Sequence, residues 1–179
     1  MLIEENLPLI EQILSQWKQK IGEDFQGYRN HIYRVVHFCF SLQTCSQEEK
    51  EKIMIASCFH DLGLWTEDSI DYLAPSILLA KKYLKEKGLG KWEKEIELMI
   101  DLHHQVREYR DNNHPLVEIF RRADLIDVSL GMIRWKLDKE YVRGVKAKFP
   151  NSGFHKKLVK LTFRQLCRNP LNLLPMMKW

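Results

Sequence analysis

Hydrophobic positions recur at helical spacing along nearly the whole chain. Between residues 7 and 20, for example, Ile10, Ile13, Leu14 and Trp17 lie three or four positions apart, which places them on one face of a helix. The chain contains no pair of alternating apolar and polar runs joined by a hairpin signal. The pattern therefore predicts an all-α protein.

Several helix boundaries are marked by residues that favour helix starts and stops. Ser46 and Glu49 have the spacing of a capping box, which satisfies two free N–H groups at a helix N-terminus. Gly63 is placed to end that helix in a left-handed conformation, and Asp138 and Ser152 are placed to cap two later helices. The expected helices cover about residues 7–20, 28–43, 47–60, 75–87, 91–104, 115–130, 139–149 and 153–167, with Pro75 and Pro115 at the start of theirs.

The composition favours one globular domain. The 179 residues are enough for a sizeable core, and we expect a single compact domain of seven to nine helices over residues 1–179. No apolar run approaches the roughly 18 residues of a membrane-spanning helix, so no membrane partner is expected. The 28 basic and 24 acidic residues leave a net charge of +4 without any long basic block, which suits a small anionic substrate better than duplex nucleic acid.

The N-terminal segment and the cysteines indicate the cellular location of the protein, and the C-terminal tail indicates how it could assemble. The N-terminal segment carries three acids before residue 12 and no early Lys or Arg, unlike a secretory signal or a transit peptide. Cys39 and Cys58 lie in apolar helical contexts, which indicates reduced core residues and a cytoplasmic protein. The apolar tail from Asn169 onward must pack on the domain or on a partner, so a homodimer is one expected arrangement.

Four ionisable residues lie where the local pattern expects a hydrophobic core. They are His31, His60, Asp61 and Asp124. Taken one at a time, each has an ordinary structural explanation, such as a hydrogen-bonded core histidine or an aspartate paired with an arginine. Taken together, two imidazoles and two carboxylates form a ligand set that suits one divalent transition metal, namely Mn, Fe, Ni, Zn or Co, rather than calcium.

The flanks of these residues resemble a known family. The segment HIYRVVHF at His31, the segment FHDLG at His60 and Asp61, and the segment RRADLIDVSLG at Asp124 are similar to the motifs of the HD-domain superfamily of metal-dependent phosphohydrolases. The resemblance covers roughly residues 27–131 and leaves the C-terminal helices and tail, 138–179, outside it. It implies a helical HD-type fold in which these four residues are the metal ligands.

The resemblance also bears on the number of metal ions. Family members with two ions add histidines between the His-Asp pair and the final Asp. This chain has His103 and His104, but DYLAPSILLAKKYL contains no histidine where another is expected. We therefore expect one ion, with His103 acting in acid–base chemistry, in substrate binding or as a further ligand. A solvent-facing His103 at a helix end is the alternative.

The function that the resemblance implies is hydrolysis of a small phosphate ester, possibly a nucleotide, by a metal-bound water. Asp61 and the imidazoles would fix the metal and Asp124 would complete its shell and align the water. Arg34 and His103 would balance developing charge. Two alternatives remain: an HD-type enzyme with hydratase or oxygenase chemistry, and a non-catalytic helical binding module with a metal site.

Overall fold

The computed structural model describes residues 2–170 and 174–178, and within these ranges the chain is helical. Eight helices have eight residues or more, and α2 and α5 are single turns. In chain order the helices are α1 (Pro8–Ser15), α2 (Lys18–Ile21), α3 (Phe25–Leu42), α4 (Gln47–Phe59), α5 (Gly63–Thr66), α6 (Leu73–Glu86), α7 (Glu93–Leu102), α8 (Leu116–Val128), α9 (Lys139–Lys148) and α10 (Phe154–Arg168), with 3-10 turns at Gly22–Asp24 and Gly90–Trp92. No strand occurs in the described ranges, so the predicted all-α class is confirmed.

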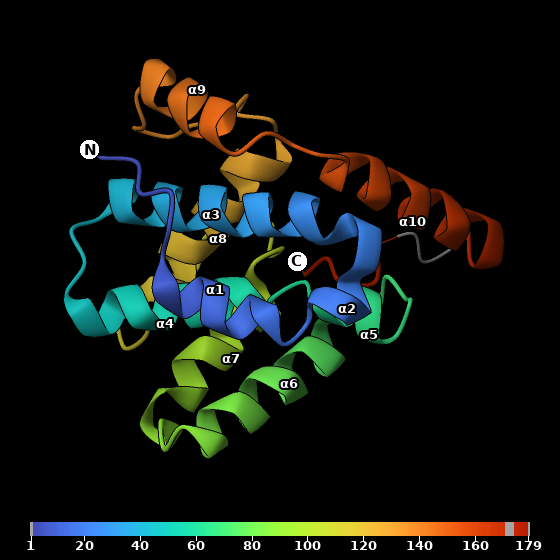
Figure 1. The fold of residues 1–179 in the computed structure, drawn as a ribbon, viewed down its shortest axis with the longest axis horizontal. Helices are drawn as coiled ribbons and strands as arrows, with labels where there is room; N and C mark the ends of the chain where they lie inside the picture. Colours follow the sequence, from blue (N-terminus) through green and yellow to red (C-terminus); the bar gives the residue numbers. More distant parts are fainter. Residues whose placement is uncertain (1, 171–173, 179) are drawn as a thin grey trace.

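The long helix α3 crosses the middle of the domain. It lies against α4 on one side and α8 on the other, while α6 and α7 form a hairpin that packs on α4 and α8 (Figure 1). Helices α9 and α10 run along the opposite edge of the molecule, above α3 in this view (Figure 1). Since α3, α4 and α8 meet one another, any residues on their facing sides are brought together.

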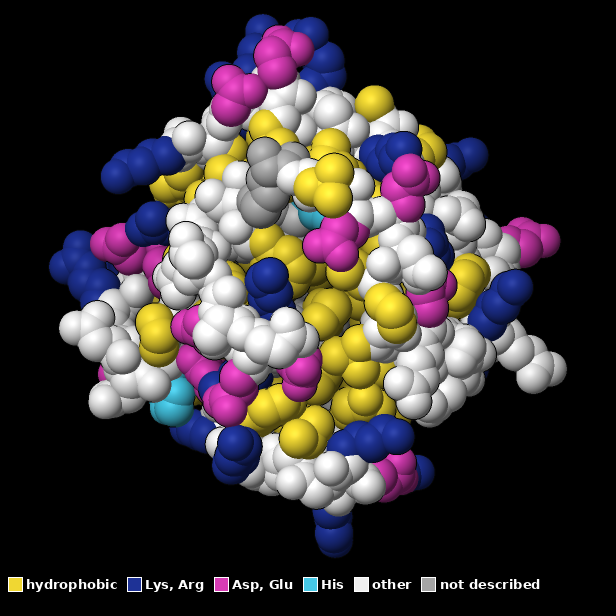
Figure 2. Space-filling view, turned by 60° about the vertical axis from the view of Figure 1, so that its left-hand side comes forward, with side chains coloured by type: hydrophobic (Ala, Val, Ile, Leu, Met, Phe, Trp, Pro, Cys, Tyr) yellow, Lys and Arg dark blue, Asp and Glu magenta, His cyan; other side chains and the backbone are white. Residues whose placement is uncertain are grey.

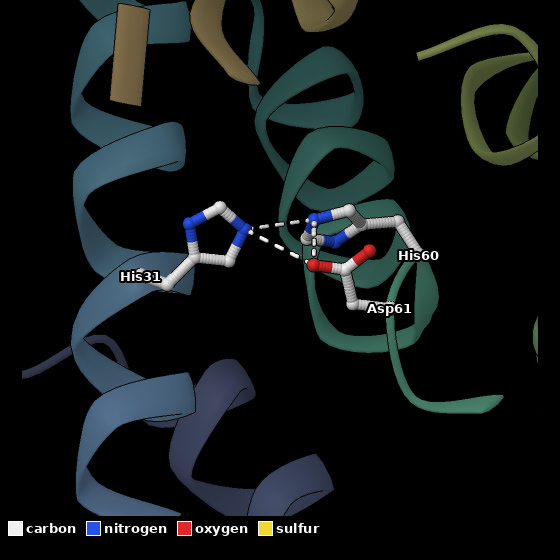
Figure 3. Close-up of side chains that lie close together, drawn as sticks. All are labelled: His31, His60 and Asp61. Carbon is white, nitrogen blue, oxygen red and sulfur yellow. Dashed lines mark hydrogen bonds and ion pairs between the residues drawn. The ribbon is translucent and has the colours of Figure 1, made fainter. Parts of the chain in front are cut away.

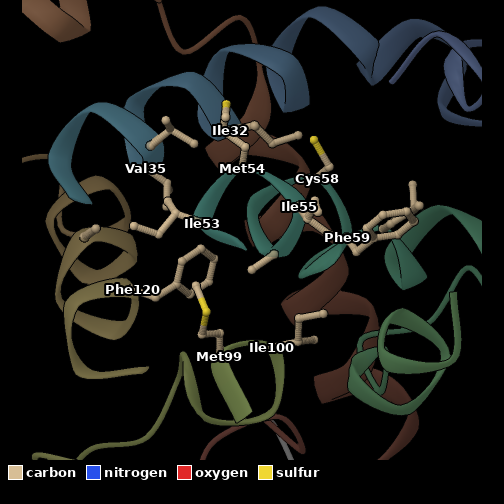
Figure 4. Close-up of a cluster of buried hydrophobic side chains, with 14 of the residues drawn as sticks. Ile32, Val35, Ile53, Met54, Ile55, Cys58, Phe59, Met99, Ile100 and Phe120 are labelled. Atoms are coloured by element: carbon tan, nitrogen blue, oxygen red, sulfur yellow. The ribbon is translucent and has the colours of Figure 1, made fainter. Parts of the chain in front are cut away.

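Buried apolar side chains fill the space between α3, α4, α7 and α8. The cluster in Figure 4 includes Ile32 from α3, Ile55 from α4, Met99 from α7 and Phe120 from α8. Burial of such side chains stabilises each by about 1.5–3 kcal/mol relative to exposure to water. This core fixes the helices that carry the candidate ligands.

Not every apolar side chain is inside. Figure 2 shows a face that includes the N-terminal end of the molecule, where hydrophobic side chains gather in a shallow hollow between charged ones. A hollow of about 550 Å³ lies between the N-terminal segment, α3 and α4, with Leu7, Phe40 and Met54 at its wall and Glu4 and Lys50 at its rim. None of the candidate ligands lines this hollow.

Two capping predictions are confirmed. Ser46 Oγ accepts a hydrogen bond from the Glu49 N–H, and a Glu49 carboxylate oxygen accepts from the Ser46 N–H at 2.7 Å. Asp138 accepts from the Tyr141 N–H at 2.9 Å and so caps α9. Both residues satisfy N–H groups that have no partner inside the helix.

Three other predicted boundaries are wrong. The helix expected over residues 7–20 breaks after Ser15, because the Gln16 and Trp17 N–H groups bond three residues back and tighten the chain. Gly63 begins α5 instead of ending α4 in a left-handed conformation. Ser152 does not cap α10, since Gly153 with φ 89° is the residue before that helix.

Glycine is nevertheless required at position 63. A Cβ atom there would lie 2.4 Å from the Tyr72 carbonyl oxygen and 3.0 Å from Ser76 Oγ. Ser76 Oγ instead accepts a hydrogen bond from the Gly63 N–H at 2.9 Å. The absence of a side chain at Gly63 thus allows the backbone at Tyr72 to pack closely against it. This packing brings the Tyr72 side chain near the candidate site.

The C-terminal tail packs on its own domain. The Val106 N–H donates to the Lys178 carbonyl oxygen at 2.8 Å, the Lys178 ammonium pairs with Asp101 at 2.5 Å, and Met176 is buried. Part of the tail, Leu171 to Leu173 and Trp179, lies outside the described residues. Cys39 and Cys58 are buried free thiols, as predicted. Within the described ranges, no helix has the length and apolarity to cross a membrane.

Candidate metal centre

Three of the predicted ligands meet between α3 and the end of α4. His31 lies in the first half of α3, and His60 and Asp61 directly follow α4, where the chain turns toward α5. His31 Nε2 lies 2.9 Å from His60 Nε2 and 3.5 Å from Asp61 Oδ2, and His60 Nε2 lies 3.3 Å from the same oxygen (Figure 3). The three donor atoms therefore surround one point.

The fourth predicted ligand joins them from α8. Asp124 Oδ1 lies 3.5 Å from His31 Nε2 and 3.7 Å from His60 Nε2. All four side chains are buried, with at most 3% of each residue exposed. The structure thus brings together residues that are separated by up to 93 positions in sequence, as the sequence analysis predicted.

His31 and His60 are each held in place by a hydrogen bond from Nδ1, the ring nitrogen that points away from the other donor atoms. His60 Nδ1 donates to the Ser57 carbonyl oxygen at 2.8 Å, and His31 Nδ1 donates to Asp127 Oδ2 at 2.7 Å. Such contacts fix the tautomer and ring orientation of metal-binding histidines, because the proton stays on the outer nitrogen. The Nε2 lone pairs of both rings are left to point into the centre.

The donor set fits a cation. Two imidazole nitrogens 2.9 Å apart repel unless a proton or a metal ion lies between them. Burial lowers the pKa of His31, but the hydrogen bonds that its ring donates to Asp127 and Asp61 outweigh this and raise the pKa to about 9, so the surroundings favour positive charge. Asp61 Oδ1 is buried without a hydrogen-bond partner among the described residues, which is costly for a carboxylate unless a cation is near.

The two carboxylates differ in their electrostatic surroundings. Burial opposes ionisation of Asp61, but His60, His103 and His31 lower the pKa of its carboxyl well below the usual range. Burial raises the pKa of Asp124 despite the same histidines. The surroundings of Asp61 therefore favour its ionised form, whereas burial opposes ionisation of Asp124.

A second cluster adjoins the first and shares Asp61. His103 Nε2 lies 3.6 Å from Asp61 Oδ1, and His104 Nδ1 lies 3.7 Å from Asp124 Oδ2. His103 is buried, and its Nδ1 donates to the Ile100 carbonyl oxygen at 2.7 Å. The solvent-facing alternative for His103 is therefore excluded, and this residue belongs to the centre.

Tyr72 completes this second cluster. Its hydroxyl lies 2.8 Å from His104 Nε2 and 3.4 Å from His103 Nε2. The sequence analysis missed Tyr72 because nothing in its local pattern separates it from an ordinary core tyrosine. It reaches the centre only because Gly63 admits the backbone at Tyr72 so closely.

Arg34 does not occupy the role expected of it. Its Nε donates to Asp127 Oδ1 at 2.5 Å, its Nη2 donates to Asp127 Oδ2 at 2.8 Å, and its Nη1 donates to the Phe149 carbonyl oxygen at 2.9 Å. Only 2% of Arg34 is exposed. Because its N–H groups are occupied away from the donor atoms, Arg34 holds Asp127, and Asp127 in turn orients His31.

The other arginines near the motifs are also paired. Arg121 and Arg122 both bind the Glu118 carboxylate, and Arg121 donates in addition to the Gln105 carbonyl oxygen. Asp68 pairs with Arg164 on the surface. Because Arg121 and Arg122 are bonded to Glu118 and Gln105, neither side chain extends to the candidate metal centre to bind an anionic substrate.

Aromatic rings close the centre on the side of α3 and α10. The Phe154 ring stacks on His31 with ring centroids 4.1 Å apart, and the Tyr28 ring lies 6.4 Å from both His31 and His60. The His104 side chain is 18% exposed, whereas His31, His60, Asp61, His103 and Asp124 are buried. Among these residues His104 is therefore the one that reaches the surface.

The chain matches no family model, no curated protein and no solved structure. The resemblance to HD-domain proteins thus rests on the three sequence motifs alone.

Proposed function

We propose that the chain is a metal-dependent hydrolase of small phosphate esters, with one divalent ion held by His31, His60, Asp61 and Asp124. The observation that carries the proposal is the convergence of these four donors, with both Nε2 atoms directed inward and Asp61 Oδ1 buried without a hydrogen-bond partner among the described residues. An ion bound there would lower the pKa of a water and polarise a phosphate oxygen. The three sequence motifs at His31, at His60 and Asp61, and at Asp124 are the reason why we propose a phosphohydrolase.

The chain's own residues divide the remaining work. His31 and His60 are fixed by Asp127 and by the Ser57 carbonyl, so they do not reorganise during a reaction. His103 keeps one proton on Nδ1 toward the Ile100 carbonyl, which leaves only Nε2 to exchange a proton. We assign His103 the transfer of a proton to the leaving alcohol, since its Nε2 faces the cluster beside Asp61.

One ion is proposed rather than two because of His104. Burial and the neighbouring His103 lower the pKa of His104 well below its usual value, so it is neutral and carries one proton. Asp61, His103 and His104 form a second group whose ligand atoms lie close enough for an ion. We assign the Tyr72 hydroxyl as the donor to His104 Nε2, 2.8 Å away, which puts the His104 proton on Nδ1 toward Asp124 Oδ2. In this arrangement His104 has no lone pair directed at a second ion.

The limited opening supports a small substrate. Phe154 and Tyr28 pack against one side of the donor cluster, and the His104 side chain at its edge is 18% exposed. We propose that the phosphate group enters at this edge while the rest of the ester stays outside. The substrate class we propose is therefore small phosphate monoesters, with nucleotides included.

The experiment compares Asp61→Asn with Asp71→Asn, which removes an exposed acid in the loop before α6. Metal content is measured on the purified proteins, and hydrolysis is measured on p-nitrophenyl phosphate and a panel of nucleotides with Mn, Fe, Co, Ni and Zn. We expect about one ion per wild-type chain and metal-dependent turnover. Asp61→Asn should lose both the ion and the turnover, whereas Asp71→Asn should keep them.

A second candidate function is favoured by the deep burial of the donors. A helical module with a structural metal site would bind the ion without turning over any ester, since a closed site offers no position for a substrate. Metal lost in Asp61→Asn with no hydrolysis in any protein would favour this module. Absence of metal from the wild-type protein under all these conditions would overturn both proposals.

A further inference from the structure

A second hollow, which none of the candidate ligands lines, lies between α9 and the loop that follows α8. It measures about 340 Å³. Arg134 from the loop and Lys139, Arg143 and Lys146 from α9 line it, and Leu130, Gly131, Met132 and Val142 supply apolar and backbone surface. We call this hollow the basic cleft. No carboxylate lines it.

The sequence of α9 explains why the cations converge. Lys139, Arg143 and Lys146 are spaced by four and three positions, so they share one face of the helix. That face points at the loop that carries Arg134. Like charges at such spacing repel one another and weaken the helix, and a bound anion would relieve this repulsion.

Few acids neutralise this cluster. Arg134 and Lys139 form no ion pair with the described residues, and Arg143 pairs only with the exposed Glu140 at 3.0 Å. Lys146 donates to the Leu130 carbonyl oxygen at 2.6 Å, and the nearby Asp138 carboxylate caps α9. Four cations thus lie beside two carboxylates, those of Glu140 and Asp138, and the cleft carries an excess of positive charge.

The wall formed by the loop is held in place. Leu130 and Gly131 both have positive φ, 56° and 79°, and a Cβ on Gly131 would lie 3.0 Å from Val142 Cγ1. The loop therefore sits directly against α9, and Lys146 ties it there through the Leu130 carbonyl. Met132 is 82% exposed and Val142 is buried, so the cleft offers apolar contact beside its charges.

We propose that the basic cleft binds an organic polyphosphate, a ligand with two or more adjacent phosphates and an apolar group. The phosphates would take the four cations, and the apolar group would contact Met132 and Leu130. A smaller hollow of about 170 Å³ shares Leu130 and Lys146 and ends at Arg34 and Asp127. The ligand site is therefore separate from the donor atoms but adjoins the pair that orients His31.

The test measures binding of adenosine triphosphate and of tripolyphosphate to the full chain by calorimetry. The variant Arg134→Ala/Lys139→Ala is compared with Lys20→Ala/Lys94→Ala, which removes two exposed lysines elsewhere and changes the net charge equally. We expect the first variant to weaken binding of both probes at least tenfold and the second to change it less than twofold. Adenosine triphosphate should bind the wild-type chain more tightly than tripolyphosphate, because only it has an apolar group.

The same measurement on chelator-treated protein separates this inference from the proposed function. Binding that persists without metal and depends on Arg134 and Lys139 supports the basic cleft, whether or not the chain hydrolyses phosphate esters. Binding that disappears with the metal and ignores the two charges places the ligand at the metal centre and overturns the inference. Equal weakening by both double variants, or no binding at millimolar concentrations, overturns it as well.

Discussion

Two arginine–aspartate pairs in this molecule have the same two-pronged geometry and opposite surroundings. Arg34 and Asp127 are joined by bonds of 2.5 and 2.8 Å in the interior, and Arg164 and Asp68 are joined by two bonds of 2.8 Å on the surface. The side chains of the first pair are 2% and 1% exposed, and those of the second are 37% and 67% exposed. Only the environment distinguishes them.

The difference shows what each pair can do. A buried charge must be matched, because water cannot replace a lost partner, so the inner pair fixes Asp127 and through it His31. Solvent and salt screen the outer pair, which links α10 to the loop after α5 but contributes little. Burial also differs along α10: its first turn is buried against the candidate metal centre, whereas much of the rest of the helix is exposed.

The largest effect is expected for Arg34→Ala. The change leaves Asp127 with one partner in the interior and removes a donor from the Phe149 carbonyl oxygen. We expect the free energy of unfolding to fall by about 3–5 kcal/mol, the range for breaking a buried ion pair. Urea denaturation measures this, and a loss below about 1 kcal/mol would show that the inner pair behaves like a surface pair.

The next effect concerns two phenylalanines of α10. Phe154 is 3% exposed and stacks on His31, whereas Phe163 is 65% exposed. Phe154→Ala should lower the free energy of unfolding by about 3 kcal/mol, and Phe163→Ala should change it by less than about 0.5 kcal/mol. Similar losses for both variants in urea would mean that the outer part of α10 is as firmly packed as its first turn.

A smaller effect is expected where the segment before α10 meets α3. A Cβ on Gly27 would lie 2.8 Å from the Ser152 carbonyl oxygen, whereas a Cβ on Gly90 would meet no atom within 4 Å. Gly27→Ala should therefore destabilise the fold by about 1–3 kcal/mol through overpacking. Gly90→Ala is the control and should stay within about 0.5 kcal/mol of the wild type. Thermal melting of the two variants side by side tests this, and equal melting temperatures would contradict the close approach.

The smallest effect is expected for Arg164→Ala. Exposed pairs contribute about 0–1 kcal/mol, and screening by solvent keeps this one within that range. Any effect should shrink further in 1 M NaCl, where charges are screened within about 3 Å. A loss above about 2 kcal/mol that salt does not reduce would place the outer pair in the same class as the inner one.

The predictable part of the site is the part encoded in local sequence. His31, His60, Asp61 and Asp124 are polar residues inside apolar helical runs, so their burial follows from the pattern of the chain. That they act together was implied by the family resemblance. Arg34 shows the limit of that reasoning. Its position three residues after His31 indicates that it faces the same way, but not that Asp127 and the Phe149 carbonyl occupy its N–H groups.

Helix ends also divide into those that local sequence predicts and those that depend on distant segments. The capping box at Ser46 and the cap at Asp138 form as predicted, because each bond joins residues three apart. The prediction that Gly63 ends α4 in a left-handed conformation is wrong. The contact that requires a glycine there comes from Tyr72, nine residues later. Ser152 failed as a cap because the segment that contains it is bound across the chain to Asn30.

By itself, the sequence determined the helical class, the main helices, two of the caps and the four residues that converge. Periodicity and capping depend on neighbours within a few positions, so they can be read along the chain. The tertiary structure alone decided that Tyr72 and Phe154 border the centre, that Asp127 orients His31 and that the cations of α9 meet Arg134. These relations join distant segments, and only packing of one helix against another sets which atoms then lie within hydrogen-bonding distance.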